Sequence, residues 1–178
     1  MFNTPKVAFA ALALFAAQAQ AQAPAAATPV QGGAISVSYI EPEKFVDVPF
    51  SPVERERVLA DLSQHFAKLG KLLPVGQDLK IEVTDLDMAG RIVYTRRSAN
   101  ELRVLNGGAD WPHMDLRYTL TANGKVIDSG SAKLSNMMYQ ETATLFNSTQ
   151  SLRYEKQMID EWFSKQFHVK VRGVRYSG

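Results

Sequence analysis

Apolar and polar side chains alternate over several short stretches of the chain, which is the pattern of strands that bury one face. Residues 35–39 carry Ile, Val and Tyr at alternate positions, and residues 79–83 repeat this with Leu, Ile and Val. Residues 102–105 predict another short strand. Val recurs among Lys and Arg over residues 169–174, which predicts a terminal strand.

The clearest strand pair lies between residues 114 and 134. Residues 114–122 alternate, Asn123-Gly124 favours the positive φ angles of a type I′ turn, and residues 125–134 lead back. We therefore expect an antiparallel hairpin, with a β-bulge at Gly130 in the returning strand.

Two stretches of helical periodicity separate the strands. The first begins at Ser51-Pro52-Val53-Glu54, where Ser51 can cap the helix and Glu54 can complete a capping box, and it ends near Gly70. The second covers residues 152–167. Together these elements predict an α+β fold, with a mostly antiparallel sheet of about four to six strands and two main helices packed on one face.

Residues 1–21 have the pattern of a secretory signal peptide. Lys6 precedes an apolar run over residues 7–17, which is too short to cross a hydrocarbon layer of about 30 Å. Possible cleavage sites of the Ala-x-Ala type end at Ala19, Ala21 or Ala23. We expect cleavage after Ala21, because Pro24 disfavours the last site. The sequence thus predicts a periplasmic protein without a lipid anchor and without a transmembrane segment in its mature chain.

Composition limits the remaining possibilities. Residues 22–34 are uncharged and rich in Ala, Pro and Gly, which indicates a flexible leader before a single domain over residues 35–178. The chain contains no cysteine, which excludes disulfides and thiolate metal sites. The 20 basic and 18 acidic side chains nearly balance, so the composition gives no indication of nucleic-acid binding.

Asp85 and Asp87 are the best-placed pair of carboxylates, since positions i and i+2 of an extended segment point to the same side. With Asp110 and Asp115 they could bind a divalent cation through oxygen ligands. In the alternative interpretation they cap the turn over residues 88–90, and Asp85 pairs with Arg91. Two carboxylates specify a metal site weakly, so we assign no metal and no cofactor.

His113 lies between Asp110 and Asp115, where one aspartate could orient it as a general base. The structural alternative makes Trp111-Pro112 an apolar plug at the start of the strand, with His113 exposed beside it. We favour the structural interpretation, because no nucleophile or acid partner stands at a recognisable spacing. It predicts that Trp111 is largely buried.

Basic residues accumulate at the C-terminus, where Lys170, Arg172 and Arg175 follow the last acidic residue, Glu161. On a strand they could present a cationic strip to anionic lipid or to an envelope polymer. In the alternative, which we favour, this is an edge strand whose exposed Lys and Arg discourage edge-to-edge pairing.

The most specific motifs of the chain are Asp85-Leu86-Asp87-Met88-Ala89-Gly90-Arg91, Arg103-Val104, Ala109-Asp110-Trp111-Pro112, Tyr154-Glu155-Lys156 and Trp162-Phe163. In combination they resemble an exported bacterial family known as domain of unknown function 3016, over about residues 35–167. The resemblance implies an exported, single-domain protein of unestablished activity, and it supplies no catalytic residues.

We therefore expect a non-enzymatic binding or envelope-assembly module, whose partner is an envelope protein, an anionic lipid or a polymer. The candidate binding residues are Asp85, Asp87, Arg91, Trp111, His113, Lys170, Arg172 and Arg175. The alternative is a metal-assisted hydrolase that uses Asp85, Asp87 and Asp110. A third hypothesis is an assembly factor recognised through an exposed sheet edge.

Overall fold

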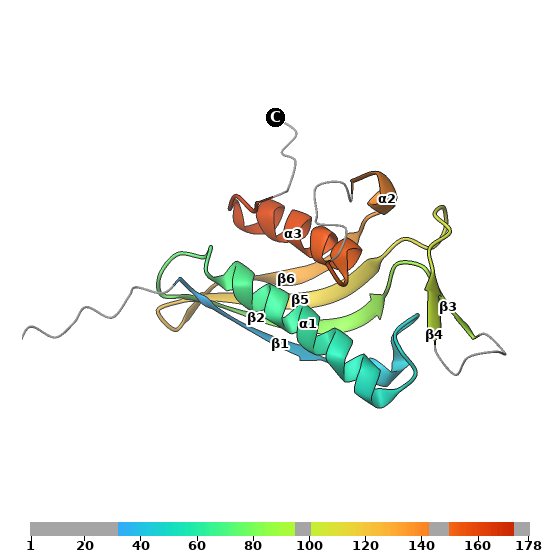
Figure 1. Ribbon diagram of the computed structural model, residues 1–178. Helices are drawn as coiled ribbons and strands as arrows, with labels where there is room; N and C mark the ends of the chain where they lie inside the picture. Colours follow the sequence, from blue (N-terminus) through green and yellow to red (C-terminus); the bar gives the residue numbers. More distant parts are fainter. Residues whose placement is uncertain (1–31, 95–100, 143–149, 173–178) are drawn as a thin grey trace, which may run out of the picture.

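The computed structural model of the protein describes residues 32–94, 101–142 and 150–172. Figure 1 shows two layers, with helices α1 (Pro52–Gly70) and α3 (Arg153–Phe167) lying over one face of a four-stranded sheet. The predicted α+β class, with a mostly antiparallel sheet and two main helices on one face, is confirmed. The predicted signal peptide and most of the leader lie outside the described residues.

The main sheet has the strand order β1-β2-β5-β6. Its strands are β1 (Ala34–Tyr39), β2 (Gln77–Asp87), β5 (His113–Ala122) and β6 (Lys125–Ser135). The β1–β2 pair is parallel, whereas β2–β5 and β5–β6 are antiparallel. Parallel neighbours need a crossover connection, and α1 supplies it between β1 and β2. This places β1 at one edge of the sheet, beside α1.

The core lies between the sheet and the two helices. Fully buried side chains from α1, β2 and α3 meet there, including Phe66, Ile81 and Phe163, each with 0% of its surface exposed. Burial of apolar area at roughly 25 cal/mol per Å² is the main force that holds the layers together. The other face of the sheet, here called the open face, carries the polar side chains that alternate with the buried ones.

The predicted hairpin is confirmed. Asn123 and Gly124 both have positive φ angles, 50° and 78°, as a type I′ turn requires. The predicted bulge at Gly130 is wrong: Gly130 pairs in register with Tyr118, and the register shifts instead opposite Leu120 and Thr121. A Cβ at Gly130 would stand 3.1 Å from the Tyr118 hydroxyl, so this glycine makes room for the tyrosine ring.

Strands β3 (Arg91–Tyr94) and β4 (Glu101–Val104) form a second, two-stranded sheet that projects from one end of the first (Figure 1). Gly90 makes the turn into it, with a φ of 77° and no space for a Cβ, which would lie 2.5 Å from the Val104 oxygen. Two short helices, η1 (Pro42–Lys44) and α2 (Tyr139–Thr142), complete the described elements.

Two further expectations need correction. Helix α1 begins where predicted, but the Ser51 side chain makes no capping bond, and Glu54 pairs with Arg57 at 2.5 Å instead of completing a capping box. The terminal strand is absent over residues 169–172, the part of it that the structure describes. Val171 is only 7% exposed and packs into the core, which holds this segment against the rest of the fold.

Helices α1 and α3 meet along a charged seam. Lys156 Nζ lies 2.8 Å from Asp61 Oδ1, and His65 Nε2 lies 2.6 Å from Asp160 Oδ1. Each helix contributes its two residues at i and i+4, which share one helix face. The two pairs therefore fix the position of one helix relative to the other along their axes.

The seam predicts an asymmetry between two substitutions. The Lys156 side chain is 5% exposed, whereas that of Asp61 is 33% exposed. Asp61→Ala strands a buried ammonium group and should lower the free energy of unfolding by about 3 kcal/mol. Lys156→Met leaves a carboxylate that water can reach, so we expect a loss of about 1 kcal/mol. Urea unfolding at neutral pH measures both, and a larger loss for Lys156→Met would contradict this account.

Candidate functional site

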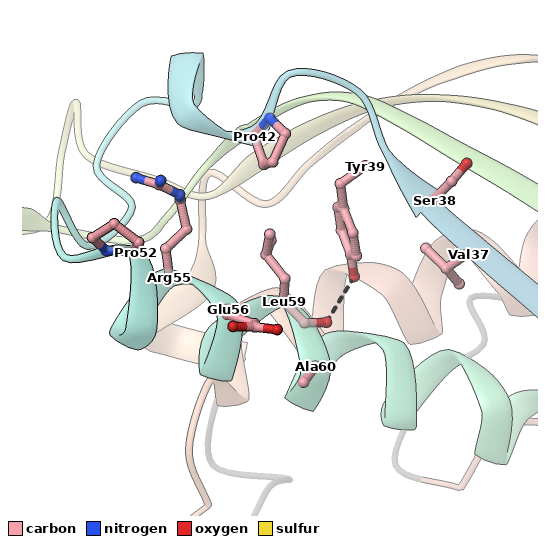
Figure 2. Close-up of a pocket in the computed structure, with 9 residues that line it drawn as sticks. All are labelled: Val37, Ser38, Tyr39, Pro42, Pro52, Arg55, Glu56, Leu59 and Ala60. Atoms are coloured by element: carbon pink, nitrogen blue, oxygen red, sulfur yellow. Dashed lines mark hydrogen bonds between the residues drawn. The ribbon is translucent and has the colours of Figure 1, made fainter.

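A groove of about 440 Å³ lies between the edge strand β1 and helix α1. Figure 2 shows that its walls come from the end of β1, from η1 and from the first turns of α1. Most of the lining is apolar: Val37, Tyr39, Pro42, Pro52, Leu59 and Ala60. Concave, mainly apolar sites with a few polar groups are typical of ligand-binding sites.

Tyr39 fixes the width of the groove. Its hydroxyl donates to the Leu59 carbonyl oxygen at 3.0 Å, drawn as a dashed line in Figure 2, and lies 3.1 Å from Ser63 Oγ. Its ring packs edge-on against Phe45, with centroids 6.5 Å apart. Burial raises the pKa of Tyr39 to about 12, so its phenol stays neutral. The strand and the helix are therefore linked directly across the groove.

The backbone of β1 has one unpaired side. The Ile40 N–H donates to the Val83 oxygen at 2.9 Å, and Tyr39 is the register partner of Val83. Because backbone groups alternate in direction along a strand, the N–H and C=O groups of Ile35, Val37 and Tyr39 point away from β2. No described residue bonds them, so they form a free edge beside the groove.

This edge has none of the features that usually block a free strand. The sequence of β1, AISVSY, contains no charge and no proline, and its pairing with β2 has no register shift. The opposite edge strand, β6, carries Lys125 and Lys133 and has an irregular register. Charges and bulges discourage edge-to-edge pairing, so of the two edges β1 is the one open to another strand.

One basic and one acidic side chain frame the groove. Arg55 lines it, and its Nη1 contacts the carbonyl oxygens of Pro49 and Phe50, each at 3.4 Å. Glu56 also lines it and is exposed. Phe50 itself is 80% exposed, so the surface stays apolar beyond the mouth of the groove. Isolated exposed apolar residues are common, but one next to an apolar groove enlarges the contact area available to a partner.

The structure places several sequence-predicted residues together on the open face. Asp87 pairs in register with His113, and its Oδ2 lies 3.2 Å from His113 Nε2. Asp85 is the register partner of Asp115, which forms an ion pair with Lys133 at 2.8 Å. Burial, together with Asp47 and Asp85, raises the pKa of Asp87 against the lowering effect of His113.

The contacts of His113 in the described structure do not include the serine in the same row. Ser135 is the cross-strand neighbour of His113, which brings Ser, His and Asp side chains into one row of the sheet. The second ring nitrogen of His113, however, lies 3.3 Å from the Trp111 carbonyl oxygen. Both nitrogens therefore face partners other than Ser135, and the row lies on the open face of the sheet.

The carboxylates of the hydrolase hypothesis do not converge. Asp110 accepts hydrogen bonds from the Tyr139 hydroxyl and the Asn106 N–H, both at 2.8 Å. Within the described ranges, no group of three or more His, Cys, Asp or Glu side chains could hold a metal ion.

The expected Asp85–Arg91 ion pair is wrong. Asp85 accepts the Leu86 N–H at 3.0 Å, and Arg91 is exposed at the start of β3, where Gly90 has turned the chain out of the sheet. Trp111 is partly buried and packs against the cluster of Ala89, Tyr139 and Tyr154. Lys170 and Arg172 are exposed, and Arg175 lies outside the described residues.

Comparison with known proteins agrees with the motifs. Residues 33–165 match the family model described as Protein of unknown function (DUF3016), and the chain belongs to this family. Neither the curated proteins nor the solved structures include a significant match. Over the part of the chain that the structure describes, no helix has both the length and the apolar character needed to cross a membrane.

The groove residues were not among the predicted site residues. Alternation identified Val37 and Tyr39 only as strand positions, and Leu59 belongs to the predicted first helix. The signal that could have found them is a short first strand without charges, followed at once by a helix, since that order favours a parallel crossover with the first strand at an edge.

Tyr39→Phe tests how the groove is held. Loss of the bond to the Leu59 carbonyl should lower the free energy of unfolding at neutral pH by about 1 kcal/mol. The raised pKa of Tyr39 adds stability that is complete below the ordinary tyrosine pKa and is lost as pH rises through about 12. Between neutral and strongly alkaline pH, wild type should therefore lose more stability than Tyr39→Phe. Parallel pH profiles of the two proteins in urea unfolding would refute this.

Proposed function

We propose that the protein is a binding module that takes an extended segment of a partner polypeptide as an added strand along β1. The observation that carries this proposal is the free backbone edge of Ile35, Val37 and Tyr39 beside the groove. An extended peptide offers N–H and C=O groups at the same spacing as a strand, so it can satisfy all of these groups together.

The groove supports the proposal by giving the added strand a place for side chains. Side chains of an added strand alternate between the two faces of the sheet, and one set would face α1. That set would meet Tyr39, Leu59 and Pro42, whose surfaces favour apolar groups. The other set would face water on the open side, next to Ser36 and Ser38. A segment with alternating apolar residues fits these requirements best.

The place of action is part of the proposal. Lys6, the apolar run over residues 7–17 and the Ala-x-Ala sites support export to the periplasm, where the partner would be an envelope protein. Mass spectrometry of the protein from the envelope fraction should give a chain that begins at Gln22. A full-length chain with Met1 in that fraction would refute export with cleavage.

Val37→Pro tests strand addition with little damage to the fold. The Val37 N–H points away from β2, so proline removes a donor from the free edge and none from the β1–β2 ladder. Linear peptides selected from a random display library on the wild-type protein provide the probe. Their affinity should fall about tenfold with Val37→Pro, which corresponds to about 1.4 kcal/mol.

Val37→Thr is the matched control, because it keeps the N–H and the branched shape and should bind within about threefold of wild type. Circular dichroism checks that both variants fold. Equal binding of selected peptides to Val37→Pro and Val37→Thr would contradict strand addition at this edge. Self-association through β1, seen as a concentration-dependent dimer that Val37→Pro abolishes, would instead assign the edge to a second copy of the chain.

A further inference from the structure

A second, smaller cavity of about 180 Å³ lies where β2 ends, where β4 ends and where α3 begins. Its lining shares no residue with the groove. The residues that determine its chemistry are Arg103 from β4 and Arg153 and Glu155 from the first turn of α3. Drug-sized ligands occupy roughly 300–1,000 Å³, so this cavity suits a smaller group.

Arg103 is held in place by uncharged acceptors. Its Nη1 donates to the Ala89 carbonyl oxygen at 2.7 Å, and its Nη2 contacts the Asp47 carbonyl oxygen and, at 3.6 Å, Met88 Sδ. Among the described residues no carboxylate lies within ion-pair distance of it. A guanidinium group has more N–H donors than these contacts use, so Arg103 keeps donors for another group.

Glu155 adds a buried carboxyl group to the same wall. It is 2% exposed, and its Oε1 accepts the Ala89 N–H at 2.9 Å. Burial raises the pKa of Glu155, while its backbone bonds, Arg103 and Lys156 act in the opposite direction. Lys156 is already paired with Asp61. A raised pKa shifts Glu155 toward its neutral form, which lessens the negative charge on the cavity wall.

Arg153 supplies a second guanidinium group. It lies over the Tyr154 ring, 4.6 Å from the centroid, which orients it at the cavity wall. Its Nη2 also donates to the Tyr154 hydroxyl at 2.5 Å. Arginines from two separate elements, β4 and α3, thus line the cavity. A tetrahedral oxyanion accepts hydrogen bonds in several directions, and arginine suits such groups well.

We propose that this cavity binds a small oxyanion with the chemistry of a phosphate group, with Arg103 as its main contact. The site is independent of strand addition at β1, because the two share no residue, and either can fail alone.

Calorimetric titration of the mature protein with inorganic phosphate, at constant ionic strength in chloride, tests the proposal. Wild type should show saturable binding at one site, and Arg103→Gln should weaken it about tenfold through loss of charge-assisted hydrogen bonds. Arg117→Gln is the control, since Arg117 is 61% exposed on the open face and its loss removes the same charge. Absence of saturable binding, or equal weakening by both variants, would overturn the proposal. Acetate that binds as tightly as phosphate would overturn the choice of a tetrahedral anion.

A pH series with sulfate, measured on wild type and Glu155→Gln, provides a second readout that does not require Arg103→Gln to fold. Sulfate is chosen because it keeps its charge over the pH range used. Wild-type affinity for sulfate should fall as pH rises through the pKa of Glu155, since the carboxylate repels the anion. Glu155→Gln keeps an acceptor for the Ala89 N–H and cannot ionise, so its affinity should stay constant. The same pH slope in both proteins would contradict the role assigned to Glu155.

Discussion

The backbone N–H and C=O groups of Ile35, Val37 and Tyr39 point outward from the edge strand β1, where no described strand pairs with them. Backbone N–H and C=O groups are strong hydrogen-bonding groups, and the free chain can satisfy these only with water. The order of elements imposes this condition. A parallel β1–β2 pair joined through α1 puts β1 at the edge and α1 above it, and both sides of the groove follow from that arrangement (Figure 1).

Contacts between distant parts of the chain keep the groove open in one geometry. Tyr39 ties β1 to Leu59 of α1, and the Asp61–Lys156 and His65–Asp160 pairs tie α1 to α3. Helix α3 in turn packs on the sheet through Phe163 and its neighbours. A site whose walls are fixed before binding loses less conformational freedom when a partner arrives, which favours affinity.

Local patterns were enough to predict most of the fold. Alternation located β1, β2 and the β5–β6 hairpin, Asn123-Gly124 identified its turn, and helical spacing located α1 and α3. The candidate sites were harder to predict from the sequence, because they depend on contacts between residues that are far apart in the chain. Asp87 meets His113 only through strand register, and Arg103 reaches Ala89 only because Gly90 turns β3 and β4 out of the sheet.

Two errors show the same limit. The Asp85–Arg91 pair is close in sequence, yet a turn between the residues separates their side chains. The predicted terminal strand has a plausible alternation, but residues 169–172 are not a strand, and Val171 is buried in the core. Side-chain pattern reports which residues are buried, and it does not report which backbone partner, if any, a segment finds.

Amide hydrogen exchange along β1 tests the central claim most directly. In the free protein the Ile35, Val37 and Tyr39 amides should exchange quickly, whereas those of Ser36, Ser38 and Ile40, which face β2, should exchange slowly. A bound peptide should slow the first set and leave the second unchanged. Slow exchange of Ile35, Val37 and Tyr39 in the monomeric free protein, or no change on saturation with peptide, would contradict the account.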